Sequence, residues 1–117
     1  MPVNRQWPGL DVRTRHGRLA ASSASADSPV EIVDVTDPAN LQQAGLIPVE
    51  AHTLFTETRN GSTYAYMGND DGSTPVFDIT NPALPVRLGR YTTNGALVHD
   101  LSVSNGIAYL NAWDAGL

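Results

Sequence analysis

The sequence contains no cysteine and no lysine, and it has no long apolar run. Without cysteine, disulfides, thiolate metal sites and cysteine nucleophiles are excluded, whereas the redox compartment stays undetermined. No stretch approaches the roughly 20 apolar residues of a membrane-spanning helix, and residues 1–10 lack the apolar core of a signal peptide. We therefore expect a segment without a signal peptide and without membrane insertion.

The charge balance is acidic. Seven arginines stand against 12 acidic side chains, which gives a formal net charge of −5. This excess repels nucleic-acid phosphates and anionic membrane surfaces, so we expect neither as a partner. The length of 117 residues, of which 41% are hydrophobic, is within the range of one small folded domain.

A unit of about 44 residues occurs more than once along the chain. The segment 32–38 ("IVDVTDP") returns as 76–82 ("VFDITNP"). Three pairs of residues are separated by the same 44 positions: Asp34 and Asp78, Pro38 and Pro82, and Gly45 and Gly89. The segment 51–68 likewise matches 98–112, with His on His, Asn-Gly on Asn-Gly and Tyr on Tyr, and a fainter copy lies at 11–23.

Each unit is predicted to form four short strands. Alternating apolar residues and β-branched residues are separated by the turn dipeptides Asn60-Gly61, Asp71-Gly72 and Asn81-Pro82, and no window has a helical period. A period of about 40–45 residues with four strands is typical of a β-propeller blade. The predicted fold class is all-β, with blades that are four-stranded antiparallel meanders.

The segments "VEIVDVTDPANLQQAGLI" (30–47) and "TPVFDITNPALPVRLGRY" (74–91) resemble the LVIVD repeat of bacterial and archaeal cell-surface proteins. The resemblance covers about residues 10–117. It rests on the Asp-x-Thr-Asp/Asn-Pro turn and on the His-Asp-Leu-x-Val-Ser start of a unit. It departs from the pattern at Leu10, which takes the His place, and at Thr53, which takes the Asp place. The resemblance implies a β-propeller and an extracellular or cell-surface location.

In a propeller of this kind the His-containing strand is innermost and the fourth strand lies at the rim. We divide the chain into an N-terminal extension or the end of a preceding blade at 1–9, a first blade at 10–49, a second at 50–93, and the inner half of a third at 94–117. Propellers close with about four to eight blades. About two and a half blades therefore predict a fragment of a larger propeller, partnered by the other blades of the full-length chain, and self-association into a closed ring is the alternative.

The order of strands predicts one shared site at the channel mouth. His52 and His99 start inner strands, and the loops 68–74 and 111–116 return to the same end. The candidate ligand- or partner-binding residues are His52, Asp70, Asp71, His99, Asp100, Trp113 and Asp114. Packing does not readily explain a tryptophan in a loop at a channel mouth, so Trp113 is the best single candidate for a partner contact.

Several of these residues have a second interpretation. His52 and His99 fit either a ring of imidazoles around a divalent metal ion in the channel or a contact that locks neighbouring blades together. Asp100 could orient His99 as in a hydrolase, but neighbours on a strand point to opposite faces, and we predict no catalytic residue. Asp70 and Asp71 are oxygen-rich as in a calcium loop, but they lack its spacing and fit a solvated hairpin loop.

The function predicted from the sequence is a non-enzymatic scaffold or recognition module without a cofactor, which binds a protein, glycan or other surface partner through its channel-mouth loops. The alternative is a propeller enzyme or metalloprotein with His52 and His99 around a central ion. Away from the mouth, we expect Asp34 and Asp78 to form turns, and Tyr66 and Tyr109 to pack between blades.

Overall fold

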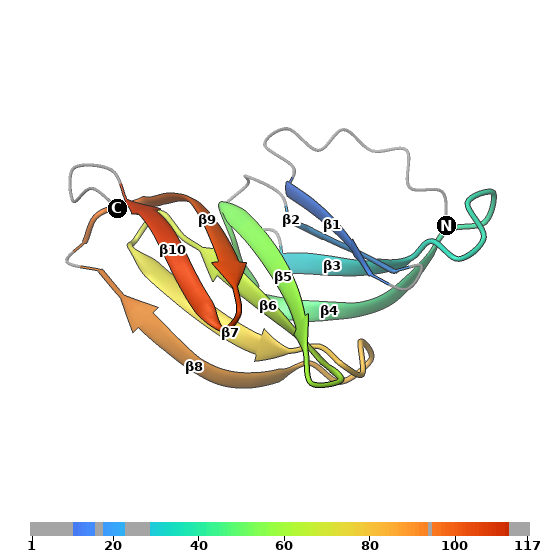
Figure 1. Ribbon diagram of the computed structural model, residues 1–117. Coiled ribbons are helices and arrows are strands. Elements are labelled where there is room, and N and C mark those ends of the chain that lie inside the picture. The colour runs from blue at the N-terminus through green and yellow to red at the C-terminus, as the bar shows by residue number, and fades with distance from the viewer. Residues whose placement is uncertain (1–10, 16–17, 23–28, 94, 113–117) are drawn as a thin grey trace.

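The computed structural model describes residues 11–15, 18–22, 29–93 and 95–112, and within these ranges the chain is built from strands without helices (Figure 1). The strands of the described ranges are β1 (Asp11–Arg15), β2 (Arg18–Ser22), β3 (Pro29–Asp34), β4 (Gln42–Glu50), β5 (Thr53–Arg59), β6 (Ser62–Gly68), β7 (Ser73–Asp78), β8 (Val86–Thr92), β9 (Val98–Ser104) and β10 (Ile107–Ala112). None of the described segments forms an apolar helix of membrane-spanning length.

The strands form three antiparallel sheets in which sequence neighbours pair. The first sheet has the order β1-β2-β3-β4, the second has the order β5-β6-β7-β8, and the third pairs β9 with β10. The predicted fold class, all-β with four-stranded antiparallel meanders of the β-propeller type, is confirmed. The division of the chain into domains stays a prediction.

Two hairpins end in turns that their sequences dictate. Asn60 and Gly61 join β5 to β6 with φ angles of 53° and 82°, and Asn105 and Gly106 join β9 to β10 with φ angles of 51° and 80°. Two consecutive residues with positive φ form a type I′ turn, whose twist matches that of the flanking strands. Asn-Gly is the dipeptide that adopts this conformation at least cost, so the sequence itself places both turns.

The turns that follow β3 and β7 are built by side chains that accept hydrogen bonds from the backbone. Asp34 Oδ1 accepts a hydrogen bond from the Thr36 amide at 2.9 Å, and Asp78 Oδ1 accepts one from the Thr80 amide at the same distance. The Thr80 hydroxyl also donates to Asp78 Oδ1 at 2.6 Å. The prediction that Asp34 and Asp78 form turns is confirmed, and both act by capturing an amide two residues ahead.

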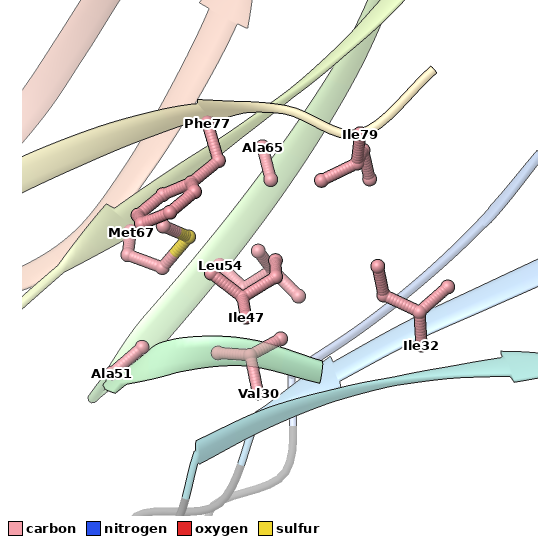
Figure 2. Packing of buried hydrophobic residues seen from close by; sticks show 9 residues of the cluster. All are labelled: Val30, Ile32, Ile47, Ala51, Leu54, Ala65, Met67, Phe77 and Ile79. Carbon is pink, nitrogen blue, oxygen red and sulfur yellow. The ribbon is translucent and has the colours of Figure 1, made fainter. Parts of the chain in front are cut away.

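The main hydrophobic core lies between the first and second sheets. Its buried members come from β3 and β4 on one side and from β5 to β7 and their flanking residues on the other (Figure 2). They are Val30, Ile32, Ile47, Ala51, Leu54, Ala65, Met67, Phe77 and Ile79. Burial of this apolar surface between sheets, more than strand pairing, holds the two meanders together.

A second cluster lies between the second and third sheets. Val98, Leu101 and Val103 of β9 are buried there, and Phe55 of β5 and Tyr66 of β6 pack against them. Tyr66 lies between two residues of the first cluster along β6, because alternate residues of a strand point to opposite faces. The second sheet is therefore covered on both faces, as a blade within a stack is.

The first strands of the three sheets lie side by side. β5 contacts β1 on one side and β9 on the other, and Figure 1 shows these strands in a row. At the opposite edge of the second sheet, every residue of β8 is exposed. This is the arrangement of propeller blades, with first strands near a common axis and fourth strands at the rim.

The second and third sheets are also joined at the turn of the β5–β6 hairpin. Arg59 Nη1 lies 2.7 Å from Glu57 Oε1, and the Arg59 guanidinium lies over the Tyr64 ring at 5.3 Å. The Gly106 amide donates to Glu57 Oε2 at 3.4 Å, and a Cβ at Gly106 would lie 2.7 Å from Arg59 Nη1. Glycine at position 106 therefore allows both the positive φ of the turn and the close approach of Arg59 from the neighbouring sheet.

Two equivalent glycines have different surroundings. A Cβ added to Gly45 of β4 would lie 1.7 Å from the carbonyl oxygen of Pro82, so the turn after β7 rests directly on the first sheet. Gly89 has the same place in β8, and no described atom lies within 4 Å of its Cβ position. Gly45 is thus covered by the turn of the neighbouring sheet, whereas no described atom covers the equivalent Gly89.

The expectation that both tyrosines of the second strands pack between sheets is half correct. Tyr66 packs against the β9 cluster, whereas Tyr109 of β10 is 48% exposed. Tyr66 lies between the second and third sheets. In the described part of the chain, β10 pairs with β9 alone, and no further sheet covers Tyr109. Val86, Leu88 and Tyr91 on β8 and Ile107 on β10 are exposed as well.

Candidate functional site

The two histidines of the inner strands lie next to each other at one end of the sheets. The His52 amide, just before β5, donates to the Gly68 carbonyl at 2.9 Å, and the Val98 amide at the start of β9 donates to the Asn69 carbonyl at 3.1 Å. These bonds hold the starts of both inner strands against the end of β6. The centres of the His52 and His99 rings are 5.5 Å apart, and the rings are tilted by 46°.

Asp70 joins the histidine pair from the loop between β6 and β7. Its Oδ1 lies 3.4 Å from His52 Nδ1. The Asp70 side chain is 75% exposed, and the His52 side chain is 31% exposed. The carboxylate can therefore orient the imidazole, although water screens most of its charge.

Asp71, the next residue of the loop, has a different role. Its Oδ1 accepts hydrogen bonds from the Ser73 hydroxyl at 2.6 Å and from the Ser73 amide at 2.9 Å. The Ser73 hydroxyl, followed by the Ser73 amide, lowers the pKa of the Asp71 carboxyl, and the charge of Arg90 adds a smaller effect. Asp71 therefore stabilises the turn, while Asp70 is the carboxylate that reaches His52.

Backbone hydrogen bonds make the loop between β6 and β7 a firm support. The Asn69 amide donates to the Ser73 carbonyl at 3.0 Å, and the Gly72 amide donates to the Asn69 carbonyl at 3.1 Å. Gly72 has a φ of +85°, and a Cβ there would lie 2.4 Å from Thr93 Oγ1. The Thr93 amide donates to the Gly72 carbonyl at 2.9 Å, which connects this loop to the segment that leads to β9.

Asn69 is a residue of the site that the sequence analysis missed. When its amide nitrogen faces the backbone carbonyls, Nδ2 donates to Gly68 at 3.1 Å and to Glu50 at 3.0 Å. Because its own carbonyl accepts the Val98 amide, Asn69 contacts the ends of all three sheets. The sequence does contain an indication of this role, because Asn69 ends a predicted strand and directly precedes Asp-Asp-Gly. Asn side chains in such turns often form hydrogen bonds with nearby backbone groups.

Asp100 is tied to its equivalent in the preceding repeat. The hydroxyl of Thr53, which takes the Asp place in the second unit, donates to Asp100 Oδ1 at 3.3 Å. The same oxygen accepts the Leu101 amide at 2.8 Å. The inner strands therefore bring equivalent residues side by side, His52 with His99 and Thr53 with Asp100.

The structure thus brings together four of the predicted site residues and ties a fifth, Asp71, into the adjoining turn. Those that meet at this end are His52, Asp70, His99 and Asp100. Trp113 and Asp114 lie outside the described residues. In the part of the chain that is described, no group of three or more His, Cys, Asp or Glu side chains is arranged to hold a metal ion.

Adjacent first strands, sheets stacked face to face and equivalent residues at one end define a β-propeller-type repeat module. Residues 62–93, which span β6 to β8, match the family model of the LVIVD repeat, so the chain carries an LVIVD repeat there and the predicted resemblance is confirmed for this segment. No curated protein and no solved structure matches the chain.

Proposed function

We propose that the chain is a non-enzymatic recognition module of a cell-surface propeller, and that it binds a protein or glycan at the end of the inner strands. The observation that carries this proposal is the convergence of His52, Asp70, His99 and Asp100 from two sheets onto one end of the molecule. Such clusters of polar groups on rigid supports are where repeat modules usually contact partners.

The chemistry of this end favours recognition over catalysis. Asp70 is largely exposed and both histidines reach the surface, so the side chains offer hydrogen-bond donors and acceptors to a partner. The Asp100 carboxylate is engaged by Thr53 and by its own strand. The cluster also repeats equivalent positions, whereas a catalytic site needs unlike groups in distinct roles. The cell-surface location is supported by the LVIVD repeat and is part of the proposal.

The test compares a variant at this end with a variant at the rim. The chain is applied to an array of glycans and to an array of peptides, together with a His52→Ala/Asp70→Ala variant and a Val86→Ser/Tyr91→Ser control. All three proteins are first required to give the same far-UV circular dichroism spectrum. We expect a ligand whose binding is lost in the first variant and kept in the control.

Two results would contradict the proposal. One is a ligand that binds the His52→Ala/Asp70→Ala variant as well as the original chain and no longer binds the rim control. The other is the absence of any ligand on both arrays. The glycan and peptide arms separate the two classes of partner.

A further inference from the structure

The His52 and His99 rings are spaced as two ligands of one shared ion would be. Their centres are 5.5 Å apart, and the rings are tilted by 46°. A nitrogen ligand lies about 2.0–2.1 Å from Zn²⁺, so two imidazoles on one tetrahedral ion have ring centres about 5 to 6 Å apart. The observed spacing falls in that range.

We propose that His52 and His99 bind one divalent transition-metal ion between their rings, with Asp70 as a positioning residue. This inference does not depend on the proposed partner binding. With no third ligating side chain arranged there among the described residues, water or a partner's ligand atom completes the coordination of the ion.

Asp70 supports the metal site through the orientation of His52. Its Oδ1 lies 3.4 Å from His52 Nδ1, and a carboxylate there favours the tautomer with the proton on Nδ1 and the lone pair on Nε2. Metal-binding histidines commonly have such a carboxylate behind them, which fixes the tautomer and raises the basicity of the ligand nitrogen. In the proposed site, the ligand atom of His52 is therefore Nε2.

The backbone around the pair is already in place. The His52 amide is bound to Gly68, and the Val98 amide beside His99 is bound to Asn69, within the same turn. Neither histidine is carried by a long unsupported loop, so little backbone entropy is lost when an ion binds. Imidazole ligands favour Cu²⁺, Ni²⁺ and Zn²⁺, whereas Mg²⁺ and Ca²⁺ require oxygen ligands.

The experiment measures binding of Zn²⁺ and Ni²⁺ to the metal-free chain by isothermal titration calorimetry, with Mg²⁺ and Ca²⁺ as comparisons. The variants are His52→Ala, His99→Ala and Asp70→Asn, and His16→Ala is the matched control because it removes the remaining histidine. We expect one Zn²⁺ per chain. Either alanine variant at 52 or 99 should lose at least about tenfold in affinity, and Asp70→Asn about tenfold. His16→Ala should bind as the original chain does, and Mg²⁺ should not bind.

A measurement on the original chain keeps the test independent of variant folding. Paramagnetic Ni²⁺ should selectively broaden the amide resonances near His52, Asn69 and His99. The proposal is overturned if Zn²⁺ affinity is unchanged in both His52→Ala and His99→Ala, if His16→Ala abolishes binding, or if Ni²⁺ broadens other regions instead. The proposal is also overturned if the original chain binds no Zn²⁺ at millimolar concentrations of the ion.

Discussion

Thr53 and Asp100 occupy the same position in consecutive repeats, and the hydroxyl of one donates to the carboxylate of the other at 3.3 Å. One of these equivalent residues is a threonine and the other is an aspartate. Thr53 is only 5% exposed and Asp100 is exposed, so a carboxylate at position 53 would be buried beside a charged neighbour. The threonine therefore relieves a charge conflict and supplies a hydrogen bond.

The substitution Thr53→Asp should accordingly destabilise the fold by about 2 to 3 kcal/mol at neutral pH, because it brings a second carboxylate next to Asp100 in a buried place. Urea unfolding at neutral pH measures this. Thr53→Asn is the uncharged control, and an equal loss of stability in both variants would refute the argument.

The two equivalent glycines allow a matched pair of substitutions. Gly45→Ala places a methyl group 1.7 Å from the Pro82 carbonyl oxygen and must displace that turn. We expect a loss of about 1–3 kcal/mol, as for other overpacked positions. Gly89→Ala meets nothing within 4 Å, and replacing a strand glycine should leave stability unchanged or raise it by up to about 1 kcal/mol. Thermal unfolding compares the stabilities of the two variants. Equal melting temperatures would contradict this prediction.

The turn after β7 should confer acid sensitivity through Asp78. The Thr80 hydroxyl, followed by the Thr80 amide, lowers the pKa of the Asp78 carboxyl. A lowered pKa in the folded state adds stability above the unfolded value of about 3.9, and this stability is lost as the pH falls through the folded pKa. Thr80→Val should raise the pKa of Asp78, and Thr80→Ser should not. A carbon-13 NMR titration of the carboxyl groups measures this, and identical pKa values for Asp78 in the two variants would contradict the assignment.

The strands should differ in hydrogen-exchange protection according to their neighbours. β6 is paired on both sides, by β5 and β7, whereas β10 is paired by β9 alone in the described ranges. We expect amides of β10, Tyr109 among them, to exchange at least about tenfold faster than those of β6. Exchange measured by NMR or mass spectrometry tests this, and equal protection of β6 and β10 would show that another element covers β10.

The local part of this structure could be predicted because its causes are local. Asn-Gly dipeptides adopt type I′ turns by themselves, and Asp78 captures the amide two residues ahead within the same turn. The 44-residue period then placed the strands between these turns. The end at which His52 and His99 meet also followed, since an even number of strands returns the chain to the same side.

What could not be predicted depends on contacts between sheets. The bond between Thr53 and Asp100 requires two strands to pack in a particular register, which no pattern within either strand records. Asn69 contacts all three sheets because its turn lies where they converge. Tyr66 and Tyr109 have the same position in their units, and they differ in exposure because only one of them lies between two sheets.

The common register of His52 and His99 lets this surface evolve by duplication. Each further copy of the unit carries its own histidine and delivers it to the same end of the molecule, so no separate mutation is needed to enlarge the cluster. A single codon change at such a position would remove one imidazole from this end. The number of imidazoles at this end can thus be changed by gene length, in steps of one repeat.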